Sequence, residues 1–339
     1  CNTHGAFDPA QAPIKQSNLC MEITLPTKPL YSVQDDSGEV ALCTLSAVNL
    51  GALDSLDELE DITDIIVRSL DSLLDYQDYP LKSAEITSNN RRTLGIGVTN
   101  LAYYLAKNDA KYSDGSGNDL IHKTFEALQY YSLKASNEIA QEFGPCPLFS
   151  ETQYAKGIMP IDSYKKDIDK FCNTKLELDW DTLRKNIQEK GLRNSTLTAL
   201  MPCESSSQIS NSTNGIEPPR GFISVKQSKD GILKQVVPEY EKLHKKYELL
   251  WDIKDNEGYL QLCAIMQKFV DQSISTNTHY DPSQYDGNRV PMKLFLMDLL
   301  KAYKYGIKTL YYHTTRDGAS DESIEKKGDD DCEDGVCKL

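Results

Sequence analysis

The stretch VALCTLSAVN at residues 40–49 and the stretch LDELEDITDIIVRSLDSLLDY at residues 56–76 together predict a strand followed by a helix. The first is a short, mostly apolar run with the length of a buried strand. The second has Leu or Ile at every third or fourth position with acidic residues between them, which is typical of an amphipathic helix. Since helical and extended patterns alternate along the chain, we expect an α/β architecture whose loops after strands carry the chemistry.

The same periodicities predict the other elements of secondary structure. Further helices are expected at residues 119–143, 180–190, 238–252, 258–274 and 292–305. Further strands are expected at residues 196–201, 220–224 and 307–312. The segment 92–97 contains Gly95-x-Gly97 but lacks a third glycine at the spacing of a dinucleotide-binding loop. We interpret it as a turn or a close packing contact.

The composition is that of a large globular protein. The chain has 339 residues, 39% hydrophobic content, a formal net charge of −14 and nine cysteines. The acidic balance argues against a nucleic-acid-binding protein, although a nucleotide can still be bound by backbone N–H groups at a helix N-terminus. No signal-like start and no apolar run near 18 residues is found, so we expect a reducing, cytoplasmic location and no membrane partner.

The segment Asn18-Leu19-Cys20-Met21-Glu22 has an amide, a thiol and a carboxylate at alternate positions. If its backbone is extended, these three side chains share one face. A thiol can perform one-electron or nucleophilic chemistry, a carboxylate can accept a proton, and an amide can hold a hydroxyl group. The alternative is a half-buried strand or loop in which Cys20 is a packed core residue.

A second candidate site directly follows the apolar run at 196–200. Its loop consists of Pro202, Cys203, Glu204, Ser205 and Ser206. A strand followed by a Ser-rich loop that enters a helix offers N–H and hydroxyl groups to a phosphate. The alternative is an ordinary helix start, in which a serine caps the helix and the acidic residue complements its dipole.

The C-terminal residues 320–339 are acidic and poor in apolar residues, so we expect a flexible tail. The tail contains Cys332 and Cys337, a pair that a flexible tether can bring to a distant disulfide for thiol–disulfide exchange. No nearby His or further Cys completes a metal site, and we expect none there. Before the tail, the adjacent Tyr311 and Tyr312 have by themselves the character of core or strand-edge aromatics.

These motifs together resemble the large, catalytic subunit of class Ia ribonucleoside-diphosphate reductase, in its enterobacterial and phage forms. The resemblance rests on segments 17–22, 41–47, 200–208 and 310–318 and on the two tail cysteines, in unbroken order from residue 1 to 339. It implies a fold that is the second part of a ten-stranded α/β barrel with a central finger loop and surrounding helices. The barrel part would span residues 1–319, and the flexible redox-active tail would span residues 320–339.

The resemblance implies a radical reduction of ribonucleoside diphosphates to deoxyribonucleoside diphosphates, and it assigns roles to the first motif. Cys20 would form the thiyl radical that abstracts the ribose 3′ hydrogen. Glu22 would be the base on the 3′ hydroxyl, and Asn18 would hydrogen-bond the sugar. Alternation along an extended segment would then explain how the three groups face one substrate.

The resemblance also implies how reducing electrons reach the substrate and how the radical reaches the reactive thiol. Cys43 would be one of two thiols that reduce the 2′ position, while Cys332 and Cys337 would re-reduce the resulting disulfide. Tyr311 and Tyr312 would be two stacked phenols that relay the radical to the reactive thiol.

The phosphate loop and the remaining cysteines complete the implied assignments. Residues Pro202 to Ser206 would bind the substrate diphosphate, with Cys203 at a position where relatives usually carry Ser. The remaining cysteines, Cys146, Cys172 and Cys263, are expected to be structural.

The implied partners lie outside this chain. They are an N-terminal portion of the large subunit, a small subunit whose metal cofactor generates the radical, a second large subunit, and thioredoxin or glutaredoxin. We expect no cofactor on this chain itself, and the allosteric nucleotides would bind the N-terminal portion. Two other functions stay open: a free-standing thiol–disulfide protein, and an inactive remnant or scaffold.

The chain begins at Cys1 with no Met before it, so we expect a fragment of a longer sequence. Two origins fit this start. One is a boundary set within a longer chain, and the other is a precursor cleaved before a cysteine, as when an intein leaves its downstream partner. In either case we expect the chain to be inactive without the N-terminal portion.

Overall fold

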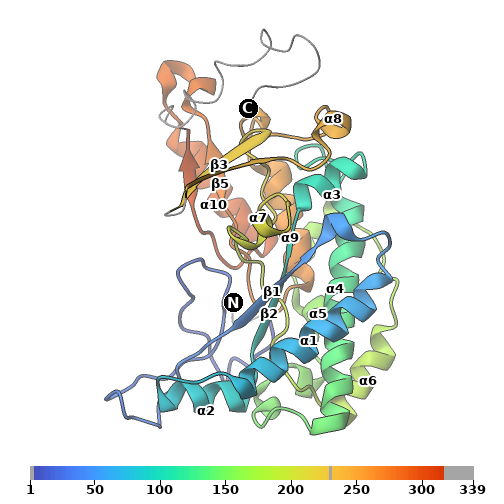
Figure 1. Cartoon of the computed structure of the whole chain (residues 1–339), viewed down its shortest axis with the longest axis vertical. Coiled ribbons are helices and arrows are strands. Elements are labelled where there is room, and N and C mark those ends of the chain that lie inside the picture. Colours follow the sequence, from blue (N-terminus) through green and yellow to red (C-terminus); the bar gives the residue numbers. More distant parts are fainter. Residues whose placement is uncertain (1–3, 229–230, 317–339) are drawn as a thin grey trace.

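The computed structural model describes residues 4–228 and 231–316, and it combines parallel strands with packed helices (Figure 1). Strand β1 (Thr44–Asn49) pairs in parallel with β2 (Leu94–Thr99). All six residues of β2 are buried. In Figure 1, the helices α1 (Glu58–Tyr76), α4 (Asn118–Phe143) and α6 (Trp180–Lys190) lie to one side of this pair.

The sheet continues through segments that lie far apart in the sequence. Parallel bridges join Ile96 of β2 to Thr198, and Leu200 to Ile274. Further along, β5 (Thr278–Tyr280) pairs in parallel with β6 (His313–Thr315). The extended segments therefore follow one another in the order β1, β2, 196–200, 272–280 and 309–315, and the described residues do not close into a barrel.

The remaining elements cover this sheet or extend from its loops. The other helices are α2 (Lys82–Arg91), α3 (Leu101–Lys107), α5 (Pro160–Ser163), α7 (Ser206–Ile209), α8 (Tyr240–Leu243), α9 (Glu257–Phe269) and α10 (Met292–Tyr305). Strands β3 (Ile223–Ser228) and β4 (Gly231–Val236) form an antiparallel hairpin. No helix in residues 4–228 and 231–316 is long and apolar enough to cross a membrane.

Local sequence patterns explain the long helices. In α1, the buried Leu59, Val67, Leu70 and Leu74 form one stripe, and the first turn is acidic, which suits the positive end of the helix dipole. This helix packs against α4. Helix α4 ends at Phe143 and is followed by Gly144, whose φ of 83° favours glycine. The predictions for α1, α4, α6 and α10 are therefore confirmed.

One helix prediction was wrong and another was too long, because long-range contacts determine those segments. Residues 238–252 contain only the single turn α8 and a 3-10 turn, since Leu250 N donates to Pro219 O at 2.8 Å. The helix predicted at 258–274 ends at Phe269, because the following residues join the sheet: Leu200 N donates to Ser273 O at 3.0 Å. In both segments the apolar pattern marks residues that are buried, and it does not set the length of the helix.

The Gly95-x-Gly97 segment is a strand, β2, so the prediction of a turn was wrong and that of a packing contact is confirmed. A Cβ atom added at Gly95 would lie 2.5 Å from Leu45 Cδ2 and 3.0 Å from Cys43 Sγ. Glycine is needed here because the neighbouring strand brings the Cys43 thiol directly against the backbone.

Candidate active site

The segment that carries Asn18, Cys20 and Glu22 is a tight turn and not an extended strand. Met21 N donates to Asn18 O at 3.2 Å, and Met21 has a φ of 71°. The Leu19 side chain is 86% exposed. The prediction that these three side chains share a face by strand alternation was therefore wrong, because short local hydrogen bonds compete with extended pairing.

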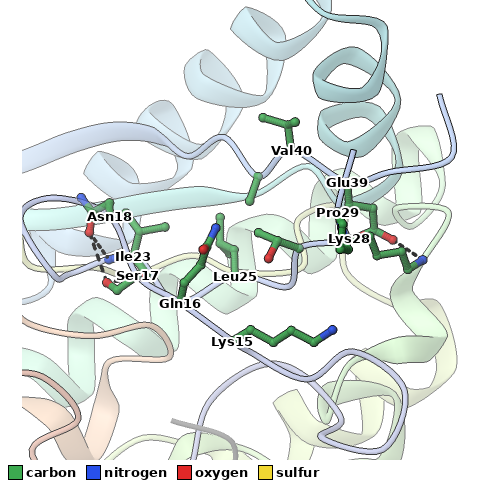
Figure 2. Close-up of a pocket in the computed structure, with 12 residues that line it drawn as sticks. Lys15, Gln16, Ser17, Asn18, Ile23, Leu25, Lys28, Pro29, Glu39 and Val40 are labelled. Carbon is green, nitrogen blue, oxygen red and sulfur yellow. Dashed lines mark hydrogen bonds and ion pairs between the residues drawn. The ribbon is translucent and has the colours of Figure 1, made fainter. Parts of the chain in front are cut away.

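The Asn18 side chain closes this turn. Its Oδ1 accepts hydrogen bonds from Ile23 N at 3.1 Å and from Ser17 Oγ at 3.3 Å, while Ser17 Oγ also lies 2.7 Å from Ile23 O. Figure 2 shows these three residues at one end of a cavity of about 480 Å³, with Lys28 and Glu39 at the other end. Within the described chain the Asn18 Nδ2 group makes no hydrogen bond, so it can donate to a ligand.

The turn is attached to the sheet through Glu22 and Cys20. Glu22 is only 2% exposed, its carbonyl oxygen accepts from Ser273 N at 2.9 Å, and its Oε2 lies 3.1 Å from Ser275 Oγ. The same Ser275 hydroxyl lies 2.5 Å from the carbonyl oxygen of Cys20. The carboxylate and the thiol residue are thus brought together by a sheet segment about 250 residues away in the sequence, and sequence reasoning had no signal for Ser275.

Cys43 is contacted by Gln272, which belongs to the same sheet segment as Ser275. Gln272 Nε2 donates to Cys43 Sγ at 3.4 Å, and Gln272 Oε1 accepts from Thr24 N at 3.2 Å. The pKa of Cys43 is raised to about 12, mainly by desolvation; the Gln272 hydrogen bond opposes the rise, and the charges of Asp271 and Glu22 add to it. The side chain is therefore a neutral thiol at physiological pH.

The two tyrosines link this site to the protein surface. The Tyr311 and Tyr312 ring centroids are 3.9 Å apart with an interplanar angle of 36°. Hydrogen bonds to Tyr312 and then to Cys20 raise the pKa of Tyr311 above its ordinary value. Tyr312 is 56% exposed, and its N–H donates to Asn277 Oδ1 at 2.8 Å. A contact path therefore runs from the surface through both phenols to the Cys20 thiol.

The Ser-rich loop follows a sheet segment, as predicted, and enters the four-residue helix α7. It lies at the end of the segment whose Leu200 O accepts from Ser275 N at 2.9 Å, next to the Glu22 contacts. The alternative, a helix start capped by a serine side chain, was wrong, since the N-cap residue of α7, Ser205, makes no side-chain cap hydrogen bond. The backbone N–H groups of Ser205 and Ser206 have no partner among the described residues, so both can bind an anion.

Cys203 is part of the support beneath this loop. Its side chain is 3% exposed, its N–H donates to Asn214 Oδ1 at 2.7 Å, and its sulfur contacts Val98 O at 3.6 Å. Asn214 Nδ2 in turn donates to Glu204 Oε1 at 2.9 Å. The cysteine in this position therefore packs into the fold and leaves the backbone donors of the loop in place.

The other cysteines divide into two groups. Cys146, Cys172 and Cys263 are buried, at 4% exposure or less, in agreement with a structural role. Cys332 and Cys337 lie outside the described residues. No group of three or more His, Cys, Asp or Glu side chains within those residues is placed to bind a metal ion.

The chain matches a family model described as the ribonucleotide reductase barrel domain over residues 1–313. It is 66% identical over 339 residues to a ribonucleoside-diphosphate reductase subunit alpha of Haemophilus influenzae, and 64% identical over 342 residues to ribonucleoside-diphosphate reductase 1 subunit alpha of Escherichia coli. The identity to the subunit alpha of Enterobacteria phage T4 is 48% over 344 residues. Each of these alignments covers 100% of this chain and 45% of the relative, so the chain spans about half the length of the curated relatives it matches.

Proposed function

The chain belongs to the ribonucleotide reductase barrel-domain family, and we propose that it carries the radical half of an active site that reduces ribonucleoside diphosphates to deoxyribonucleoside diphosphates. The observation that carries this proposal is the contact path from the exposed Tyr312 through Tyr311 to Cys20. A buried structural cysteine would need no such path to the surface.

In the first step, a radical from a partner subunit oxidises Tyr312, and the hole passes to Tyr311. Stacked rings at 3.9 Å suit this transfer, because each phenol can give up and regain its proton locally. The hydrogen atom of the Cys20 thiol then moves to the Tyr311 oxygen, which restores the phenol and leaves a thiyl radical on Cys20. The family implies that the radical originates at a metal cofactor of the small subunit.

In the second step, the Cys20 thiyl radical takes the 3′ hydrogen of the ribose, and the Glu22 carboxylate takes the proton of the 3′ hydroxyl. The 2′ hydroxyl leaves as water. Two electrons and two protons come from Cys43 and a second thiol, which become a disulfide. The 3′ hydrogen then returns from Cys20, and Glu22 gives its proton back to the 3′ oxygen. Because Cys43 is kept as a neutral thiol, it can supply a proton together with an electron.

Binding and orientation of the substrate would be shared between two loops. Asn18 Nδ2 would donate to a sugar hydroxyl, and residues Pro202 to Ser206 would bind the diphosphate. The position of this loop beside the segment that contacts Glu22 supports the assignment.

The rest of the relatives' length would supply the remainder of the site. The parallel segments described above would form about half of a ten-stranded barrel, with the turn at Cys20 as its finger loop. The second thiol for Cys43 and the allosteric nucleotide sites would lie on the N-terminal portion. Residues 320–339, with Cys332 and Cys337, would re-reduce the disulfide and exchange with thioredoxin or glutaredoxin in the cytoplasm. A second large subunit would complete the dimer.

An assay of dCDP formation tests this function. The chain is combined with an N-terminal portion of the large subunit and with a small subunit, and an intact large subunit serves as the positive control. We expect dCDP from the mixture and none when Cys20→Ser replaces the wild-type chain. No product from the mixture, together with product from the control, would contradict the proposal. Disulfide reduction without any dCDP would instead favour a free-standing thiol–disulfide protein.

A further inference from the structure

The Ser275 hydroxyl contacts the two groups that must act together on the substrate. It lies 3.1 Å from Glu22 Oε2 and 2.5 Å from the carbonyl oxygen of Cys20. On the basis of the proposed function, we propose that Ser275 is a positioning residue that holds the Glu22 carboxylate and the Cys20 backbone in a fixed relation during hydrogen abstraction.

Ser275 is suited to this role because its own backbone is fixed by the sheet. Its N–H donates to Leu200 O at 2.9 Å, and the carbonyl of the next residue, Thr276, accepts from Tyr311 N at 2.8 Å. Ser275 is 5% exposed. The turn at residues 18–22 belongs to no strand or helix, whereas the serine belongs to a segment that pairs on both sides. The rigid element therefore places the groups of the less regular one.

The Glu22 carboxylate depends on this single side chain. Across residues 4–228 and 231–316, Ser275 is the only side chain that hydrogen-bonds to the carboxyl group of Glu22. One oxygen, Oε2, is engaged, and Oε1 has no protein donor. An oriented carboxylate with one open oxygen is what a base on a substrate hydroxyl requires.

A serine hydroxyl can keep this contact in both protonation states of Glu22. It has one proton to donate and two lone pairs to accept. The single Ser275 proton faces two acceptors, Glu22 Oε2 at 3.1 Å and the Cys20 carbonyl oxygen at 2.5 Å. When Glu22 takes the substrate proton on its open Oε1, Oε2 stays an acceptor for the Ser275 hydroxyl. The contact is therefore kept in both states, and no heavy atom has to move.

The test uses three variants of the complete large subunit, assayed with its small subunit for CDP reduction. Ser275→Ala removes the hydroxyl, and Ser275→Thr retains it. Ser132→Ala is the matched control, since Ser132 is fully buried in α4 and its Oγ donates to the Leu128 carbonyl at 2.6 Å, away from the site. Melting temperatures are measured for all three variants.

We expect Ser275→Ala to lower kcat about 10- to 100-fold with KM for CDP nearly unchanged, because a small displacement of reacting groups costs rate and not binding. Ser275→Thr should recover kcat to within about threefold of the wild type, and Ser132→Ala should retain it. A purely structural role would predict equal losses for the two alanine variants.

Three results would overturn the inference: an unchanged kcat in Ser275→Ala, a loss confined to KM, or a folded Ser275→Thr as inactive as Ser275→Ala. A wild-type enzyme that forms no dCDP would contradict the proposed function itself. An active wild type with an equally active Ser275→Ala would contradict only the role of Ser275.

Discussion

The two ends of the candidate site differ in their access to solvent. At one end, Cys43 is packed against Gly95, receives a hydrogen bond from Gln272, and has a pKa raised to about 12. At the other end, Tyr312 is 56% exposed and stacks on Tyr311. Cys43 is thus partly buried and kept as a neutral thiol, whereas the tyrosine pair opens to solvent. Under the proposed function, the reducing thiol would be the less accessible group, and the radical path would begin at the surface.

The largest effect is expected at the exposed end. Tyr312→Phe keeps the ring but removes the O–H that must be oxidised, so we expect CDP reduction to fall by more than about 1000-fold, which corresponds to about 4 kcal/mol in the barrier. Turnover is measured with radiolabelled CDP, and assembly with the small subunit by sedimentation. Tyr130→Phe, at a tyrosine of α4 outside the path, should remain active. Full activity in Tyr312→Phe would show that the exposed tyrosine is not part of the radical path.

The next prediction concerns the reactivity of Cys43. Because desolvation raises the pKa of Cys43 from 9.0 to about 12, the thiolate fraction at pH 8 is lower by about 1000-fold than for an ordinary cysteine. Alkylation of Cys43 by iodoacetamide, followed by peptide mass spectrometry, should be slower by a similar factor. The rate should rise about tenfold per pH unit towards pH 12. Unfolding in guanidinium should restore the ordinary rate of alkylation. Rapid alkylation of Cys43 in the native protein would contradict a raised pKa of this thiol.

Gln272 is predicted to stabilise the end of the site at Cys43. Gln272→Ala removes the donor to Cys43 Sγ and the acceptor of Thr24 N, and it leaves Leu94 O with one donor fewer. We expect the free energy of unfolding to fall by about 3 kcal/mol, measured by urea denaturation. Gln284→Ala, at a side chain on the surface, serves as the control and should change stability by less than about 0.5 kcal/mol. Equal stability of the two variants would mean that Gln272 does not support this end.

The smallest effect is expected from Gly95→Ala. The new methyl group would meet Leu45 Cδ2 and Cys43 Sγ, which must both shift. Overpacking of this kind should lower the free energy of unfolding by about 1–2 kcal/mol, and the melting temperature provides the measurement. A more stable variant would show that the space beside Cys43 is larger than the structure indicates.

Local sequence patterns by themselves determined the long helices and picked out the candidate site residues. The stripe of Leu and Ile in α1 requires only neighbours three and four positions away, so it can be read without a fold. The Asn18, Cys20 and Glu22 motif and the Tyr311–Tyr312 pair were likewise recognisable as short segments. Their catalytic roles remain predictions, and the tail cysteines lie outside the described residues.

Only the tertiary structure decided how these groups meet. The early end of α9 and the contacts of Ser275 and Gln272 depend on hydrogen bonds between residues more than 60 positions apart, and these contacts also fix the locally closed turn at residues 18–22 against the sheet. Such contacts leave no periodic signal, because each joins one residue to one distant partner. The sequence determined which chemical groups are present, and the packing of parallel segments determined which of them touch.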